Sequence, residues 1–91
     1  MKRIIFVDDE EKLLQGIKRS LRYKASEWDM VFAVGAENAL KELEQSRFDV
    51  IISDMRMPGM DGATLLQRVH QLYPHMVRIV LSGYEIGRAH V

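Results

Sequence analysis

The sequence lacks cysteine, an excess of charge of either sign and any long apolar run. Without cysteine, the chain has neither disulfides nor thiolate metal sites. Its 13 basic side chains balance 13 acidic ones, so charge gives no reason to expect nucleic acid or an anionic membrane as a direct partner. Only four apolar residues separate Arg3 from Asp8. A membrane span needs about 20, and a signal peptide also needs a longer run. We therefore expect a soluble, cytoplasmic domain.

The apolar residues that are present follow two different periods. Four short runs rich in β-branched residues predict buried strands. These runs are residues 4–7, 30–34, 50–52 and 79–81. Between them, apolar residues at helical spacing predict helices over about 10–23 and 37–45 and a third helix that Pro74 stops. Strict alternation predicts an α/β domain with a parallel sheet, helices on its faces and right-handed crossovers. The strand order does not follow from this pattern.

Polar residues follow three of the predicted strands. Asp8 and Asp9 follow the first, Ser53 and Asp54 end the third, and Ser82 follows the fourth. Ligands of open parallel sheets bind outside the carboxyl ends of the strands. If these strands are neighbours, the repulsion between the carboxylates favours a bound cation, and an all-oxygen ligand set suits Mg²⁺. A carboxylate beside Mg²⁺ can act as a nucleophile towards a phosphoryl group.

Each feature taken alone also has a simpler explanation. The acidic residues 8–11 would favour the positive N-terminus of the first helix, and Asp54 could simply begin a turn. Asp61 is a plausible N-cap of the third helix. His70 has no partner histidine or cysteine at ligand spacing and fits an ordinary helix residue. The combination is far more specific than its parts.

Three segments together resemble the receiver domain of bacterial two-component response regulators. They are "IIFVDDE" (4–10), "DVIISDMRMPGMDG" (49–62) and "RIVLSG" (78–83). The acidic pair, the D-x-x-M-P-x-M-D-G loop and the Ser-Gly pair occur in the order typical of that family. The resemblance covers residues 2–84. It implies a flavodoxin-like three-layer α/β/α fold, with strand order 2-1-3-4-5 in the complete family.

The resemblance also implies a role for each matching residue. Asp54 corresponds to the phosphoacceptor, which takes a phosphoryl group from the phosphohistidine of a sensor histidine kinase. Asp9 corresponds to the direct Mg²⁺ ligand and Asp8 to its water-bridged companion. The backbone carbonyl of Arg56 would complete the metal shell together with Asp54.

Further implied roles fall at the end of the fourth strand. Ser82 corresponds to the switch hydroxyl that turns onto the phosphoryl group, and Gly83 to the small residue that leaves room for it. Arg56 and Tyr84 occupy positions that tune the lifetime of the phosphoryl group in the family. In the intact parent protein, an output domain would respond to the phosphorylation of this domain.

The resemblance stops after Tyr84. The family continues with a fourth helix, a fifth strand that ends at a lysine, and a fifth helix, so we expect strand order 2-1-3-4 alone and a marginal, aggregation-prone fragment. One back-translation of "EIGRAHV" (85–91) looks like a short-read sequencing adapter. We therefore interpret residues 85–91 as a non-native tail. The alternative is a native loop with the first turn of a helix.

The leading hypothesis is a phosphoacceptor switch rather than a turnover enzyme. A phosphatase-type hydrolase with an aspartyl nucleophile is disfavoured, because such enzymes typically carry a second aspartate where this chain has Arg56. A nucleotide-binding flavodoxin-like domain is disfavoured by the acidic segment after the first strand. A degenerate receiver that serves only as a binding module is disfavoured by the intact Asp8, Asp9 and Asp54.

Overall fold

The computed structural model describes residues 1–81. The predicted site residues Ser82, Gly83 and Tyr84 lie outside these described residues. The interpretation of residues 85–91 as a non-native tail falls outside them as well.

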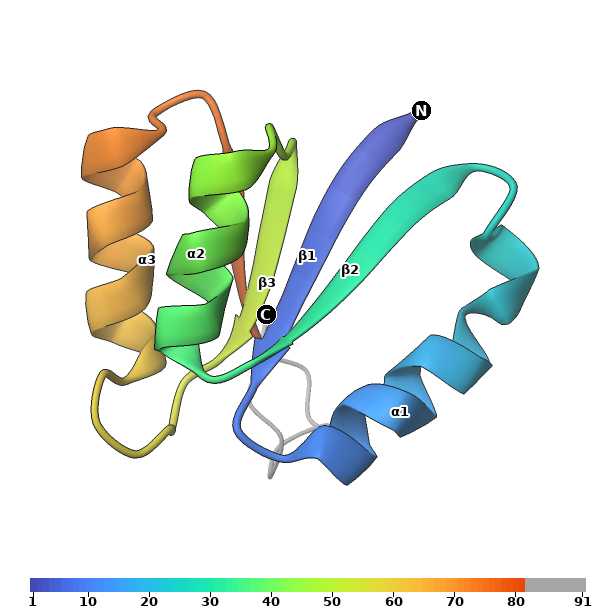
Figure 1. Ribbon diagram of the computed structural model, residues 1–91, viewed down its shortest axis with the longest axis horizontal. Helices are drawn as coiled ribbons and strands as arrows, with labels where there is room; N and C mark the ends of the chain where they lie inside the picture. Colours follow the sequence, from blue (N-terminus) through green and yellow to red (C-terminus); the bar gives the residue numbers. More distant parts are fainter. Residues whose placement is uncertain (82–91) are drawn as a thin grey trace.

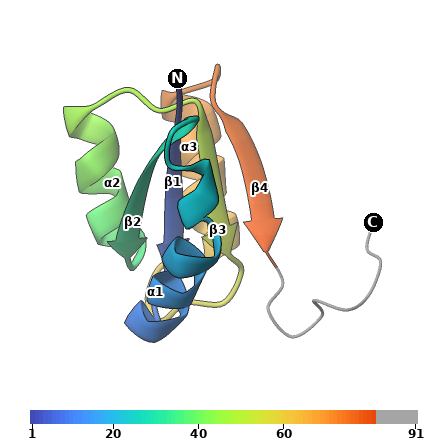
Figure 2. The same cartoon turned by 90° about the vertical axis from the view of Figure 1, so that its right-hand side faces the viewer.

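Within residues 1–81, four parallel strands form a single sheet in the order β2-β1-β3-β4. They are β1 (Lys2–Asp8), β2 (Trp28–Val34), β3 (Val50–Asp54) and β4 (Val77–Leu81). Figure 2 shows β2 at one edge of the sheet and β4 at the other. The predicted α/β fold is confirmed, and so is the 2-1-3-4 order that the resemblance implied.

Three α-helices cover the two faces of this sheet. They are α1 (Glu11–Ser20), α2 (Ala36–Gln45) and α3 (Gly62–Leu72). Figure 1 shows α2 and α3 together on one side of the sheet and α1 alone on the other, which gives three layers. No helix within residues 1–81 is both long enough and apolar enough to cross a membrane.

Several element boundaries differ from the sequence prediction, since β1, β2 and β4 each begin two residues earlier than predicted and the first helix is shorter. The predicted first helix divides, because α1 ends at Ser20 and a 3-10 turn, η1 (Arg22–Lys24), follows it. Tightening of the last turn into 3-10 geometry is common at helix ends and leaves no strong sequence signal. Strand β2 begins two residues earlier than predicted, where Arg3 of β1 pairs with Asp29 at 2.8 Å.

Each face of the sheet has its own apolar cluster. The larger cluster lies under α2 and α3 and includes the fully buried Ile5, Ile51, Leu65 and Val69. The smaller cluster lies under α1, and its buried members are Ile4, Phe6 and Leu14. Successive strand residues point to opposite faces, so neighbouring positions in β1 and β3 feed different clusters. The two central strands, β1 and β3, are therefore packed on both faces.

Candidate functional site

Three aspartates meet at the carboxyl ends of two adjacent strands. Asp8 is the last residue of β1 and Asp54 the last residue of β3, and these strands pair in parallel with Val7 opposite Ser53. Asp9 directly follows β1. One carboxylate oxygen from each of the three aspartates lies within 4.8 Å of the others. The sheet topology thus brings together side chains that are 45 residues apart in the sequence (54 − 9).

Asp8 is fixed in place from both its side chain and its main chain. It is only 5% exposed, and its Oδ1 accepts a hydrogen bond from the backbone N–H of Glu10 at 2.9 Å. Its backbone carbonyl accepts a second hydrogen bond from the N–H of Gly35, also at 2.9 Å. Since Gly35 has a φ of 86°, glycine suits the turn that brings its N–H to the end of β1. Asp8 therefore holds a defined position before any ligand arrives.

The main chain of Asp54 is held just as closely. The buried Ser53 hydroxyl donates a hydrogen bond to the Asp54 carbonyl at 2.9 Å. Gly62, the first residue of α3, packs so tightly here that a Cβ atom would collide with that same carbonyl oxygen. The Gly62 N–H also donates to the carbonyl of Met55 at 2.8 Å. This contact requires glycine and fixes where β3 ends.

The loop between β3 and α3 is anchored at several points. Met57 is buried in the larger cluster, and Gly59 adopts a positive φ of 77° that suits glycine. Asp61 caps α3, since its Oδ1 accepts a hydrogen bond from the Thr64 N–H at 2.8 Å. That bond lowers the pKa of the Asp61 carboxyl. Arg56 is exposed in the same loop, two residues after Asp54 in the sequence.

The electrostatics of this cluster favour a cation. The pKa of Asp8 is raised above its ordinary 3.8, chiefly by burial. The hydrogen bond from the Glu10 N–H lowers this pKa, while the charges of Asp54 and Asp9 raise it further. A carboxylate whose ionised form is destabilised by its neighbours is stabilised again when a divalent cation binds between them. The donors are all oxygens, and two of the three side chains, Asp9 and Asp54, reach solvent. These residues therefore fit Mg²⁺, which prefers a few carboxylates and keeps several waters.

Comparison with known proteins identifies the family. The sequence profile of the response regulator receiver domain matches residues 4–89 of this chain. The chain belongs to the response regulator receiver domain family. Its fold agrees, because the structure matches a signal receiver domain of an HD domain-containing protein from Pseudomonas fluorescens Pf-5 with a TM-score of 0.84. The two are 39% identical, over 90% of this chain and 64% of that one.

Other receiver domains are similar to the same part of the chain. The response regulator TrrA from Thermotoga maritima, solved in complex with Mg²⁺–BeF, has a TM-score of 0.83 and 30% identity over 97% of this chain and 75% of its own. The hydrogenase transcriptional regulatory protein HoxA of Bradyrhizobium diazoefficiens is 36% identical over 89% of this chain but only 16% of its own. The response regulator FleR of Pseudomonas aeruginosa is 33% identical over 90% and 17%. The chain thus spans about a sixth of these longer regulators.

The structure brings some of the predicted site residues of this receiver domain together. Asp8, Asp9 and Asp54 come together, and Arg56 lies in the adjoining loop. The part played by Gly62 was not predicted from the sequence. The sequence shows only that a glycine follows the residue that caps α3. From that alone, a glycine needed for close backbone contact cannot be distinguished from a glycine in an ordinary turn.

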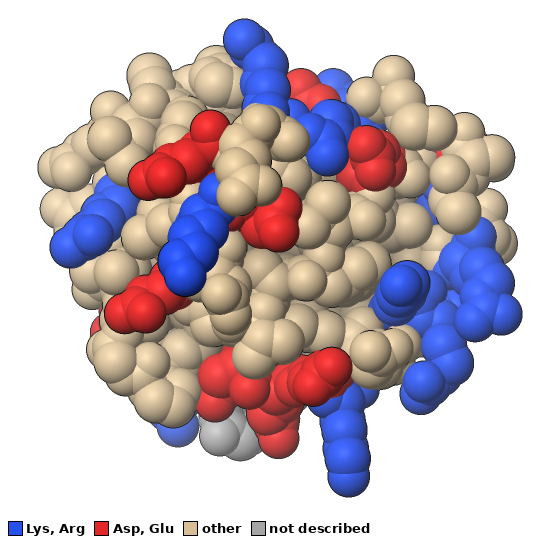
Figure 3. Space-filling view, in the orientation of Figure 1, with Lys and Arg blue, Asp and Glu red and all other residues tan. Residues whose placement is uncertain are grey.

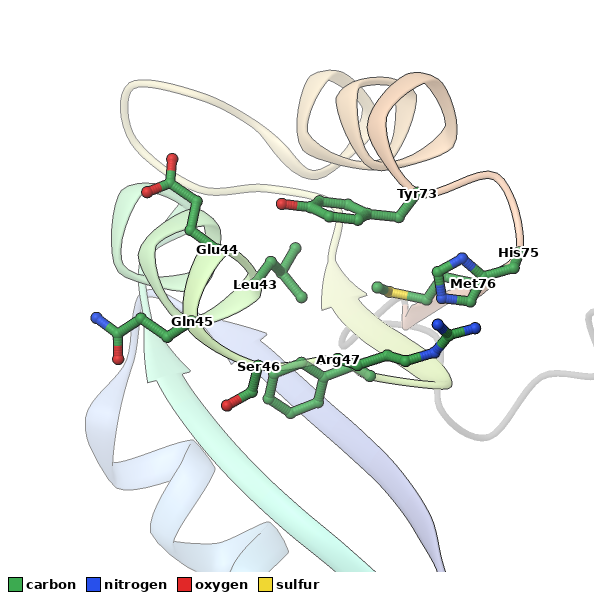
Figure 4. Close-up of a pocket in the computed structure, with 9 residues that line it drawn as sticks. Leu43, Glu44, Gln45, Ser46, Arg47, Tyr73, His75 and Met76 are labelled. Atoms are coloured by element: carbon green, nitrogen blue, oxygen red, sulfur yellow. The ribbon is translucent and has the colours of Figure 1, made fainter.

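A separate hollow lies at the opposite end of the receiver's strands. Its volume is about 380 Å³, and Figure 4 shows residues from the end of α2 and from the segments that follow α2 and α3 around it. Phe48 and Met76 form buried parts of its wall, while Arg47 and His75 are exposed at it. These segments precede β3 and β4, so the hollow faces the amino ends of the strands and contains none of the three clustered aspartates.

Proposed function

We propose that this receiver domain accepts a phosphoryl group on Asp54 in a Mg²⁺-dependent reaction, with a sensor histidine kinase as the donor. The observation that carries the proposal is the convergence of the Asp8, Asp9 and Asp54 carboxylates within 4.8 Å at the ends of β1 and β3. The TrrA receiver, to which this chain is 30% identical, was solved with Mg²⁺–BeF. That finding supports the same type of ligand here.

In the proposed reaction, a carboxylate oxygen of Asp54 forms a bond to phosphorus. The bond from phosphorus to the imidazole nitrogen of the donor breaks, and that nitrogen keeps the electron pair. Bound Mg²⁺ supplies positive charge that offsets the charge on the phosphoryl oxygens. Asp8 and Asp9 would hold the ion, together with Asp54 and the backbone carbonyl of Arg56. The half-buried Asp54 remains accessible to the donor, whereas the buried Asp8 is not positioned to react.

The proposed outcome is a switch rather than repeated turnover. Phosphorylation turns the Asp54 carboxylate into an acyl phosphate with more negative charge and new acceptor oxygens, and these bias the surface that an output domain reads. In this proposal Ser82 contacts the phosphoryl group, Gly83 leaves room for it, and Arg56 and Tyr84 tune its lifetime. We also propose a cytoplasmic location, where a kinase and an output domain of the parent protein would both be available.

A mass measurement with a small phosphodonor tests the proposal. The chain is incubated with acetyl phosphate and Mg²⁺, and the intact mass is recorded before and after hydroxylamine. We expect one hydroxylamine-labile phosphate adduct in the wild type and none in Asp54→Asn. The matched control is Asp61→Asn, because asparagine also caps helices well and the exposed Asp61 lies in the neighbouring loop. This control should form the adduct at the wild-type rate.

Two further measurements separate the proposal from its alternatives. Chelation of Mg²⁺ should abolish the adduct, because the ionised Asp8 and Asp9 then repel the phosphoryl oxygens. Steady release of phosphate from phosphomonoesters would instead indicate a hydrolase. A folded chain that forms no adduct in the presence of Mg²⁺ would contradict the proposal and favour a binding module.

A further inference from the structure

A second hollow lies between edge strand β2 and the segment formed by α1 and η1. Its volume is about 530 Å³. Three large apolar side chains of β2 line it, and we call it the β2 groove; these side chains are Trp28, Met30 and Phe32. Three basic side chains from α1 and η1 also line it, namely Lys18, Arg19 and Arg22. An apolar, partly aromatic floor with cations along one side is thus present on the surface.

The three basic side chains of the β2 groove are available to a partner. All three are exposed, and none forms a salt bridge with any residue in the described range 1–81. By contrast, Lys24 pairs with Glu27 at 3.2 Å, outside the groove lining. Asp29, the only acidic residue in that lining, is paired with Arg3 at 2.8 Å.

The groove also lies in a basic part of the chain, although the chain as a whole has no net charge. Residues 12–29 carry five basic and two acidic side chains, a net charge of +3, while the rest of the chain carries eight and eleven, a net charge of −3. Lys and Arg gather on the right of Figure 3, the side on which α1 lies in Figure 1. Part of the basic charge is therefore concentrated on the α1 side of the molecule.

We propose that the β2 groove binds an acidic segment of a partner protein that carries an aromatic or large aliphatic anchor. The anchor would pack on Trp28, Met30 and Phe32, and the acidic groups would pair with Lys18, Arg19 and Arg22. Nucleic acid fits less well, because its charge extends beyond three cations and would meet the net negative remainder of the chain. This interaction goes beyond the proposed phosphoryl transfer, since the groove shares no residue with the aspartate cluster.

Tryptophan fluorescence reports directly on this groove. Trp28 is the only tryptophan of the chain and lies in the groove lining. The probe is a serine-flanked peptide of alternating glutamate and phenylalanine, titrated into the 91-residue chain at low salt. We expect a saturable change in Trp28 emission and a binding constant that weakens as salt is added. The same peptide with glutamine in place of glutamate should bind at least about tenfold more weakly.

Charge-reversal variants locate the binding site. Arg19→Glu with Arg22→Glu should weaken peptide binding at least about tenfold, because two attractive contacts become repulsive. Lys41→Glu with Arg68→Glu changes the net charge equally, but on exposed positions of α2 and α3 across the sheet, and should leave binding within about twofold. Circular dichroism confirms that each variant is folded.

Several outcomes would overturn the proposal. These are no saturable response to the acidic peptide, equal binding of the glutamine peptide, and an equal loss of binding in the two double variants. Tighter binding of a single-stranded oligothymidylate than of the acidic peptide would assign the groove to nucleic acid instead. Phosphorylation of Asp54 is measured separately by mass, so failure of one proposal leaves the other intact.

Discussion

The two faces of the sheet are covered to very different extents. The face under α2 and α3 carries thirteen buried residues of one cluster, including Phe48 and Leu65. The face under α1 carries three buried residues and seven that are only partly buried, such as Phe32 and Ile52. On that second face a hollow of about 510 Å³ lies against Phe6 and Ile52 beside α1. Within residues 1–81, two helices bury one face over β1 and β3, one helix leaves the other face half open, and the side chains of β4 are exposed.

The strand ends show why this difference bears on function. Because side chains alternate along β1 and β3, Asp8 follows Ile4 and Phe6 on the α1 face, while Ser53 lies on the α2–α3 face with Ile51. By the same alternation, Asp54 follows Ile52 on the α1 face. The less covered face therefore carries the half-buried Asp54 carboxylate beside the buried Asp8.

A phenylalanine on the well-covered face should be the most costly to remove. Phe48 is 1% exposed, and the guanidinium of Arg3 lies 4.5 Å from its ring centroid. Phe48→Ala therefore removes both a packed ring and a cation–π contact. We expect a loss of about 3–5 kcal/mol in the free energy of unfolding, measured by urea denaturation. The matched control is Tyr23→Ala at a 73% exposed ring, which should cost about 0.5 kcal/mol or less.

Equal losses in Phe48→Ala and Tyr23→Ala would contradict the burial that the structure gives these rings. An unchanged slope of free energy against urea concentration is expected in both variants, since neither should alter how much surface unfolds. A change in that slope for Phe48→Ala would instead indicate that the cooperative unit itself has been broken.

The same substitution on the open face should cost less. Phe32 is only partly buried and stacks on Phe6, with ring centroids 4.9 Å apart and planes 9° apart. Phe32→Ala loses the stacking and part of the apolar burial, so we expect a loss of about 1–2 kcal/mol by urea denaturation. A loss as large as that of Phe48→Ala would show that the α1 face is as tightly packed as the other face, and the contrast between the faces would fail.

Much of the fold could be predicted from the sequence, because helical and strand periods alternate without interruption. The β-branched runs gave the four strands, and Asp61 could be identified as a helix cap from its position alone. The order of the strands came from resemblance, since alternation fits several orders equally well. The division between α1 and η1 near Leu21 depends on local backbone geometry that cannot be predicted from residue type.

The features of the candidate site that depend on residue type could be predicted from the sequence. The features that depend on contacts between distant segments could not. Asp8, Asp9 and Asp54 stand out because three strand-end carboxylates are unusual in one small sheet. The close approach of Gly62 to the Asp54 carbonyl depends on how α3 docks, and so does the burial of Met57. Such contacts join segments whose relative position is set only by the complete fold.

The smallest expected effect concerns Asp8, at the end of the open face. Its pKa is raised, chiefly by burial, so ionised Asp8 destabilises the folded state at pH 7 when no metal is bound. Asp8→Asn removes that charge, and asparagine can still accept the Glu10 N–H. We therefore expect Asp8→Asn to melt at a higher temperature than the wild type at pH 7 in the presence of a chelator, as measured by circular dichroism.

The sign of the pH dependence distinguishes this explanation from a general effect of charge. As pH falls towards the ordinary pKa of 3.8, wild-type Asp8 takes up a proton and its penalty disappears, so the advantage of Asp8→Asn should shrink. Asp61→Asn provides the opposite case, because the lowered pKa of Asp61 stabilises the fold above 3.8 and that stabilisation is lost as pH falls further. Excess Mg²⁺ should raise the melting temperature of the wild type more than that of Asp8→Asn, since a ligand stabilises only the state that binds it. A wild type that melts above Asp8→Asn without metal would mean that the open face already neutralises Asp8 by contacts within the chain.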